Sequence, residues 1–315
     1  MSHLHDCLIV GGGAAGLNAA LVLGRARRDV VVLDAGRQSN LPAHAVGGLI
    51  AHEGTAPAAL YAAAHAQLEG YPSVRVQRGE ATALVRRDDG TFEARLAGGG
   101  ALRARRILLA TGMDYVPPDL PGVAERWGDA VFHCPFCHGW EVRDRPLAVL
   151  GDGETGVFKA LLLRGWSDDV VLVGSGFGAA DRAKLEAAGI VVDERSVVAV
   201  TGERATLVFA DGTELPRDGV LVGAPLRQRS PLAEALGVEL DPAGTIAVDD
   251  FGRTSVPGVF AAGDVAGTLQ MVAAAIGAGG RTGAFVHTSL LAEDHGLPFP
   301  PGATRRGEEP AATAR

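Results

Sequence analysis

Two cysteines separated by two residues are the clearest sign of chemistry in this sequence. Cys134 and Cys137 enclose Pro135 and Phe136, and His138 follows directly. In a reducing compartment this spacing indicates redox catalysis or metal binding before it indicates a structural disulfide. A turn that leads toward a helix lowers the pKa of one thiol, so that a thiolate is available for exchange near neutral pH.

Two other interpretations of the cysteine pair are open. Cys-x-x-Cys-His is also the attachment signature of c-type haem, which requires export. His133 and His138 could join the cysteines in a zinc site, although directly adjacent side chains do not easily all reach one tetrahedral ion. Redox chemistry is favoured because the motif lies between two glycine-rich nucleotide-binding patterns. An unperturbed histidine titrates near pH 6.5, so His138 suits the removal of a proton from an incoming thiol; its alternative role is to cap a turn.

The first glycine-rich pattern lies near the amino terminus. Residues 6–10 form a short apolar run that meets Gly11-Gly-Gly-Ala-Ala-Gly16, and a helical stretch follows to about Arg28. A second apolar run, residues 30–33, ends in Asp34. The glycines admit a pyrophosphate to the amino terminus of the helix, and the acid after the second strand takes a ribose hydroxyl. The segment therefore predicts a complete dinucleotide site.

The pattern recurs in the middle of the chain, but less completely. An apolar run leads into a loop with glycines at Gly151, Gly153 and Gly156, a helical segment and a further apolar run over residues 170–173. That run ends in Gly174-Ser175, without the acid for NAD or an arginine cluster for the phosphate of NADP. The sequence thus predicts NADP binding here only weakly.

Acidic residues inside the second loop weaken the prediction further. Asp152 and Glu154 would repel a pyrophosphate, although acids are also ordinary residues at the amino terminus of a helix. Two more strand ends carry polar groups. Residues 106–110 run into Thr111-Gly112, and residues 258–262 run into Gly263-Asp264 before a helical stretch that starts at about Gln270.

Composition limits the classes of function. The chain has 315 residues, 47% apolar and 21% charged, which suggests two globular domains. A net charge of −8 argues against nucleic-acid binding. No run approaches 18 apolar residues and Met1–Asp6 resembles no signal peptide, so we expect a cytoplasmic protein without a membrane partner. Cys7 lies in an apolar run and is expected in the core. From about Pro300 we expect a disordered tail.

These landmarks, in this order, resemble the flavoprotein disulfide reductases of the low-molecular-weight thioredoxin reductase type over residues 5–290. In that family the redox pair precedes the second glycine loop, as Cys134 and Cys137 precede Gly151 here. The resemblance implies an α/β fold of two Rossmann-like dinucleotide-binding domains, the second inserted into the first, and a homodimer. It places an FAD-binding domain at residues 1–114 and 246–315, and an NAD(P)-binding-like domain with the redox motif at residues 115–245.

The resemblance also implies roles for individual residues. Asp34 would contact the FAD ribose, Asp264 the ribityl chain and Gln270 the flavin ring. Cys137 would face the flavin and Cys134 the substrate. The full set of FAD contacts that it implies comprises Gly11, Gly13, Ala14, Ala15, Gly16, Asp34, Asn40, His44, Thr111, Gly112, Gly263, Asp264, Gln270, Met271 and Val272. For His44, a role outside the flavin site is the alternative. Phe136 and Trp140 could line an apolar substrate pocket or belong to the ordinary core.

Two departures separate this chain from the standard reductases. The family motif usually reads Cys-Ala-Thr-Cys-Asp, and the basic clamp for the NADPH phosphate is replaced by Ser175-Gly-Phe-Gly178. Cys-Pro-Phe-Cys-His looks more like the FAD-dependent dithiol oxidases that close the disulfides of gliotoxin and holomycin. We therefore expect oxidation of a small-molecule dithiol by dioxygen, with hydrogen peroxide formed. The alternatives are an NAD(P)H-dependent reductase of thioredoxin or a thioredoxin-like protein, and a redox-sensing flavoprotein without turnover.

Overall fold

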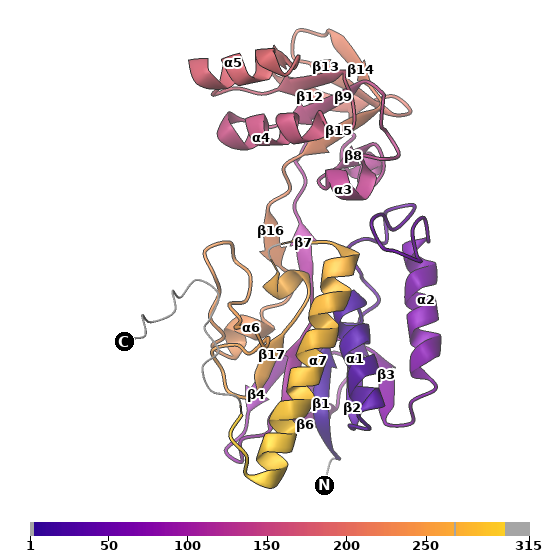
Figure 1. The fold of residues 1–315 in the computed structure, drawn as a ribbon, viewed down its shortest axis with the longest axis vertical. Coiled ribbons are helices and arrows are strands. Elements are labelled where there is room, and N and C mark those ends of the chain that lie inside the picture. Colours follow the sequence, from indigo (N-terminus) through magenta and orange to yellow (C-terminus); the bar gives the residue numbers. More distant parts are fainter. Residues whose placement is uncertain (1–2, 268, 300–315) are drawn as a thin grey trace, which may run out of the picture. The chain divides into compact units, whose positions relative to one another are not determined.

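The chain forms two compact units in a computed structural model that describes residues 3–267 and 269–299 (Figure 1). The first unit comprises Met1–Ser39, Ala58–Asp114 and Leu226–Arg315, and the second comprises Asn40–Pro57 and Tyr115–Pro225. Contacts therefore group the segment Asn40–Pro57 with the redox motif, and residues 226–245 with the glycine loop of the amino terminus. The tail expected from Pro300 lies outside the described residues.

The first unit is built on a mixed sheet with the strand order β3-β2-β1-β6-β5-β4, and β17 pairs with β6. β1, β2, β3, β6 and β17 are parallel, whereas β4 and β5 form an antiparallel extension. The strands are β1 (Leu4–Val10), β2 (Val30–Asp34), β3 (Val74–Arg78), β4 (Ala81–Arg86), β5 (Phe92–Leu96), β6 (Ala101–Leu109) and β17 (Val259–Ala261).

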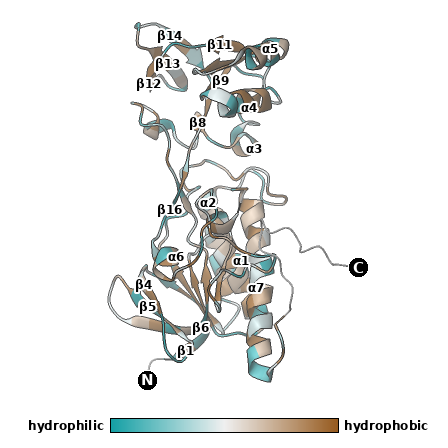
Figure 2. Cartoon of the chain, turned by 90° about the vertical axis from the view of Figure 1, so that its left-hand side faces the viewer, coloured by the Kyte–Doolittle hydropathy of each residue, from teal (hydrophilic) through white to brown (hydrophobic). Residues whose placement is uncertain are grey.

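Helices cover this sheet because its central strands are apolar on both faces. β2 reads Val-Val-Val-Leu-Asp and is buried throughout, as parallel strands between two layers are. One core cluster joins a face of the sheet to α1 (Ala14–Arg25), α2 (Pro57–Leu68) and α7 (Val272–His295). The other core includes α6 (Leu232–Ala235). Figure 2 shows the strands as the more hydrophobic elements.

Helices α1 and α7 approach each other closely through small residues. A Cβ atom on Gly279 of α7 would lie only 2.0 Å from the carbonyl oxygen of Ala15, and one on Gly283 would lie 3.0 Å from that of Ala19. These contacts leave no room for side chains between the two backbones. The position of α1, which begins at the first glycine loop, is therefore set by α7.

The second unit contains a parallel sheet of five strands in the order β11-β10-β9-β15-β8. Its strands are β8 (Val131–Phe132), β9 (Leu147–Leu150), β10 (Val170–Val173), β11 (Val191–Asp193) and β15 (Gly219–Val222). Its helices are α3 (Pro135–His138), α4 (Gly153–Leu163) and α5 (Ala179–Ala187). An antiparallel sheet of β12 (Val197–Thr201), β13 (Ala205–Phe209) and β14 (Glu214–Arg217) packs into the core on the other face.

The remaining elements are short. β7 (Met113–Tyr115) and β16 (Leu226–Gln228) form a two-stranded sheet. Two short 3-10 helices are η1 (Ala124–Arg126) and η2 (Asp264–Ala266). The expected α/β fold of two Rossmann-like domains, the second inserted in the sequence of the first, is confirmed. Within the described residues no helix is both long and apolar enough to cross a bilayer.

Candidate redox and cofactor sites

Cys134 and Cys137 form a disulfide at the start of α3 in the second unit, with their Cα atoms 5.3 Å apart. Cys134 is the N-cap residue, Pro135 takes the first helical position, and the amide of Cys137 donates a hydrogen bond to the carbonyl of Cys134. Cys134 is buried and Cys137 is half-buried. Cys7 is a buried free thiol whose pKa is raised by burial, so it is unsuited to exchange.

His138 ends α3 with one ring nitrogen bonded and the other free of hydrogen bonds within the described residues. Nε2 lies 3.1 Å from the carbonyl oxygen of Gly128, which only accepts, so Nε2 carries the proton. Nδ1 is buried and makes no hydrogen bond. Burial lowers the pKa of His138, against the opposing effect of the Gly128 carbonyl. The imidazole is therefore neutral at pH 7, with a lone pair on Nδ1.

His133 is an aromatic packing residue. Its ring lies 4.2 Å from that of Tyr115 and stacks on Trp127 at 5.5 Å. Burial, with smaller effects of His138 and Lys159, lowers the pKa of His133 to about 4. The nearby Lys159 donates a hydrogen bond to the carbonyl of Val222. These contacts leave His133 neutral and packed between aromatic rings.

The segment Asn40–Pro57 packs against the redox loop, which the sequence did not predict. A Cβ atom on Gly47 would lie 2.7 Å from the carbonyl oxygen of Cys137, and one on Gly128 would lie 3.2 Å from the carbonyl carbon of Pro42. His44 is exposed, and its Nε2 lies 3.8 Å from a carboxylate oxygen of Asp129. Gly47 and Gly128 thus permit close contact between the segment Asn40–Pro57 and the redox loop, which no sequence motif connects.

The aromatic residues of the redox loop are not in the core. Phe136 and Trp140 are exposed, with 54% and 63% of their surface accessible. Phe136 contacts the edge of Trp166 at 5.4 Å, and the guanidinium of Arg143 lies over the Trp140 ring at 3.9 Å. Of the two interpretations left open for these residues, ordinary core packing is excluded.

The first glycine loop has the shape of a pyrophosphate cradle. Gly11 has φ +120°, and a Cβ atom there would meet the carbonyl oxygen of Ala110 at 2.1 Å. One on Gly16 would lie 1.9 Å from the carbonyl oxygen of Gly11. At Gly13, the N-cap of α1, nothing lies within 4 Å, and the first turn of α1 holds no acid. The open face beside a helix amino terminus suits an anion.

Asp34 ends β2 beside this loop and is buried. One carboxylate oxygen accepts hydrogen bonds from the amide of Gly36 at 2.7 Å and from Gln38 at 3.1 Å; the other lies 3.2 Å from Nε2 of His65. A Cβ atom on Gly12 would lie 2.3 Å from the Asp34 carboxyl carbon. Gln38 and His65 were missed in the sequence, because neither has a characteristic spacing.

The remaining residues expected at FAD lie at the carboxyl ends of parallel strands or at the start of α7. Thr111 and Gly112 follow β6, while Gly263 and Asp264 follow β17. Since both strands run parallel to β1, these turns lie at the same edge of the sheet as the glycine loop.

The other expected residues lie near the start of α7 or in the second unit. Gln270 donates a hydrogen bond to the carbonyl of Gly267. Met271 is the N-cap of α7 and Val272 its first residue, whereas Asn40 and His44 lie in the second unit. The glycine cradle and buried carboxylate fit FAD.

The second glycine loop has a similar backbone but different electrostatics. A Cβ atom on Gly156 would lie 2.3 Å from the carbonyl oxygen of Gly151, as in the first loop. The N-cap of α4, however, is Asp152, and Glu154 lies in its first turn. Asp152 accepts hydrogen bonds from the amide of Ser175 at 2.7 Å and from its hydroxyl at 3.1 Å. The carboxylate of Asp152 therefore lies at the end of β10, where a nucleotide ribose would bind.

The arginines that follow β10 are paired with acids. Arg182 lies 2.7 Å from Glu194, and Arg195 lies 2.6 Å from Asp193. Binding a 2′-phosphate there would require these pairs to be broken. The two loops thus share a fold, while only the first presents an uncharged helix start to a phosphate.

Two α/β units, each with a glycine loop after a parallel strand, and a Cys-x-x-Cys disulfide before the second loop define a two-domain disulfide oxidoreductase. The chain belongs to the pyridine nucleotide-disulphide oxidoreductase family, whose model matches residues 5–279. It is therefore an enzyme of the thioredoxin-reductase-like type, as the sequence predicted. Members bind FAD and have a domain for NADPH, so FAD is the cofactor of this protein.

Individual relatives cover nearly the whole chain. "Thioredoxin reductase tcpT" of Claviceps purpurea is 33% identical, over 94% of this chain and 97% of its own length. The crystal structure of HlmI is 41% identical with a TM-score of 0.88, over 93% of this chain and 95% of that one. An oxidoreductase from Agrobacterium tumefaciens is 36% identical with a TM-score of 0.87, over 92% and 99% of the two chains.

Proposed function

We propose that this protein oxidises a small-molecule dithiol to an intramolecular disulfide with dioxygen as the final acceptor, releasing hydrogen peroxide. The observation that carries the proposal is the second glycine loop, where Asp152 accepts a hydrogen bond from Ser175 and Glu154 lies in the first turn of α4. Two carboxylates at this place oppose the binding of a nicotinamide nucleotide. Electrons from a thiol substrate do not need that site, whereas electrons from NADPH do.

The exchange steps use the cysteine pair. A substrate thiolate attacks Sγ of Cys134, which breaks the Cys134–Cys137 bond and leaves Cys137 as a thiolate. The second substrate thiolate then attacks the substrate sulfur of the mixed disulfide and expels the Cys134 thiolate. The substrate leaves oxidised, and the two cysteines hold its electron pair. When bound, FAD supplies the oxidant for the cysteine pair and the link to dioxygen, so the sum is dithiol + O₂ → disulfide + H₂O₂.

His138 is the base that the proposal assigns to the incoming thiol. It ends α3, four residues after Cys134, and its buried Nδ1 carries a lone pair at neutral pH. Burial lowers its pKa, which keeps the imidazole unprotonated and ready to accept. The exposed rings of Phe136 and Trp140 offer apolar surface for an organic dithiol beside the disulfide.

The proposal also covers the cofactor, compartment, oligomeric state and partner of the enzyme. The first unit holds FAD through its glycine loop, Asp34 and the turns after β6 and β17, and the second unit presents the redox motif. The enzyme acts in the cytoplasm as a homodimer, in keeping with the family resemblance. A thioredoxin-like protein as the disulfide partner is the second candidate, which is favoured by the name of the Claviceps purpurea relative.

Anaerobic mixing experiments separate the two functions. The purified yellow enzyme is mixed in a stopped-flow instrument with dithiothreitol as a model dithiol, with NADPH, or with NADH, and absorbance near 450 nm is followed. We expect the dithiol to bleach the flavin and peroxide to form when air returns. Bleaching by NADPH within seconds, with turnover of added thioredoxin, would refute the oxidase. Cys134→Ser and Cys137→Ser should each abolish turnover and retain FAD.

A further inference from the structure

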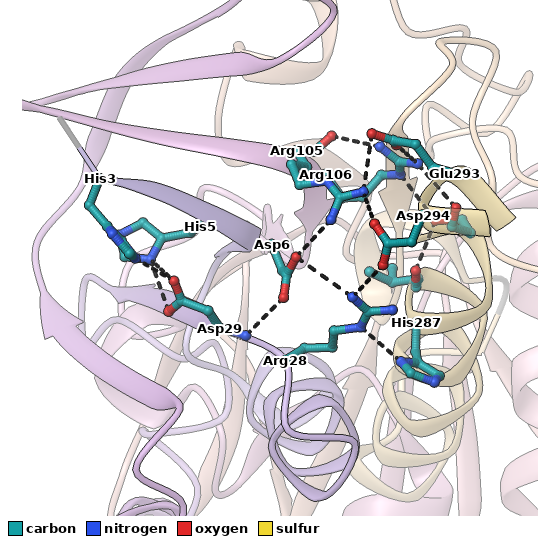
Figure 3. A network of polar contacts seen from close by, with 12 residues as sticks. His3, His5, Asp6, Arg28, Asp29, Arg105, Arg106, His287, Glu293 and Asp294 are labelled. Carbon is teal, nitrogen blue, oxygen red and sulfur yellow. Dashed lines mark hydrogen bonds and ion pairs between the residues drawn. The ribbon is translucent and has the colours of Figure 1, made fainter. Parts of the chain in front are cut away.

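A cluster of two histidines and one carboxylate lies at the opposite edge of the first sheet from the glycine loop. His3 precedes β1 and His5 lies within it, two residues apart, so both side chains leave the strand on the same face. Asp29 directly precedes β2, the parallel neighbour of β1. The start of two adjacent strands thus brings the three side chains together, as Figure 3 shows.

The distances within the cluster suit a single small ion. Nε2 of His3 lies 2.5 Å from Oδ2 of Asp29, and Nδ1 of His5 lies 3.0 Å from the same oxygen. One ligand atom from each residue lies within 4.8 Å of the other two. Ligand atoms around a tetrahedral ion with bonds of about 2.0–2.2 Å are separated by roughly 3.3–3.6 Å. Both nitrogen–oxygen distances are shorter than this, so shifts of about 1 Å or less in the side chains would bring the two pairs to such separations.

The backbone of the cluster is held firmly while one side remains open. The amide of Asp29 donates to the carboxylate of Asp6, and Asp6 accepts from Arg105 at 3.1 Å. Arg105 in turn contacts Asp294 near the end of α7 (Figure 3). The side chain of His5 is 8% exposed and that of His3 is 70% exposed. Water can thus complete the coordination from the His3 side.

The charges around the cluster favour a cation. The arginines of the neighbouring network pair with acids other than Asp29: Arg28 and Arg105 contact Asp6 and Asp294, and Arg106 contacts Glu293. The carboxylate of Asp29 faces the two imidazoles instead. Two imidazoles and one carboxylate form a donor set that binds Zn²⁺ and neighbouring divalent transition metals, rather than Ca²⁺ or Mg²⁺.

We propose that His3, His5 and Asp29 bind one divalent transition-metal ion of the zinc class. The ion clamps the beginning of β1 to that of β2 and takes no part in electron transfer, because the glycine loop and the strand ends expected at FAD lie at the other edge of the sheet. The proposal is independent of the substrate and of the electron acceptor of the enzyme.

Zinc binding to the tag-free holoenzyme tests the site. The titration calorimetry is done without reductant, so that Cys134 and Cys137 stay in their disulfide and cannot bind zinc. We expect one Zn²⁺ per chain and a higher melting temperature in its presence. His3→Ala removes an exposed ligand and should weaken binding by on the order of tenfold or more. Asp29→Asn should do the same, with FAD content and circular dichroism unchanged.

His295→Ala is the matched control, because His295 is an exposed histidine at the end of α7 and should leave the binding unchanged. His5 is buried, so the test does not depend on its replacement. Binding of equal affinity and stoichiometry in the wild type and in His3→Ala would overturn the proposal. So would a wild-type enzyme that binds no zinc, since the three side chains would then be joined by hydrogen bonds alone.

Discussion

Gly279 offers the sharpest test of how the fold holds its cofactor. A Cβ atom at this position would lie 2.0 Å from the carbonyl oxygen of Ala15, whereas ordinary contact begins at 3.4 Å. The obstacle is backbone, so Gly279→Ala forces α7 and α1 apart by more than 1 Å. Overpacking of this kind costs about 1–3 kcal/mol. Because Ala15 lies in the pyrophosphate loop, we expect FAD affinity to fall by at least tenfold.

Gly277 provides the control within the same helix. It is exposed, and nothing lies within 4 Å of a Cβ atom there. Since alanine is a better helix former than glycine, Gly277→Ala should stabilise the protein by roughly 0.5–1 kcal/mol. The two variants thus carry the same chemical change with opposite expected signs.

The assay measures the flavin-to-protein absorbance ratio after dialysis and the midpoint of urea unfolding. Gly279→Ala should lose flavin and unfold at lower urea, while Gly277→Ala should keep its flavin and unfold at equal or higher urea. If both variants retain flavin and stability alike, the close approach of α1 and α7 does not position the FAD loop, and the reasoning is refuted.

Three further predictions concern the second unit. Gly47→Ala should slow turnover at least tenfold with FAD retained, because its Cβ atom would lie 2.7 Å from the Cys137 carbonyl oxygen. Gly98→Ala is the control, because nothing lies within 4 Å of a Cβ atom there. Equal turnover rates in the two variants would contradict the contact. His138→Phe should lower kcat/KM by about 100-fold. Because burial lowers the pKa of His138, the wild type should stay active at about pH 6.5 and lose activity only at lower pH. If the wild type already loses activity at or above about pH 6.5, or if His138→Phe shows the same loss at low pH, His138 is not the base. His133 has a pKa of about 4 when folded and about 6.5 when unfolded, so protonation favours the unfolded chain as pH falls from about 6.5 to about 4, by at most about 3 kcal/mol. Urea midpoints measured across this range should fall less steeply for His133→Phe than for the wild type, and parallel curves would contradict the assignment.

Local patterns explain which parts of the fold were predictable. The strand, glycine loop and helix around Gly11–Gly16 are fixed by neighbours in sequence, and Asp34 follows at a characteristic interval. A redox pair at Cys134 and Cys137 was predictable from their spacing together with their place between the two glycine-rich patterns. These features depend on few residues and on backbone geometry that only glycine or a tight turn permits.

The rest depended on contacts between distant segments. The packing of Gly47 on Cys137 and the approach of His65 to Asp34 join residues far apart in sequence that belong to no motif. The Asp152–Ser175 contact required knowing that β9 and β10 pair in register. His3 and His5 did carry a signal: two histidines at alternate positions of a predicted strand, with an acid just before the next parallel strand.

The completion of the first sheet has a consequence for synthesis. β17 pairs with β6, and α7 packs on α1, but the segment Tyr115–Pro225 of the second unit lies between these partners in the chain. A ribosome moving at about 5–20 residues per second therefore finishes the redox unit before the last strand and helix of the other unit exist. Until α7 emerges, the nascent α1 lacks the surface that positions it. We therefore expect flavin capture only after α7 has been made.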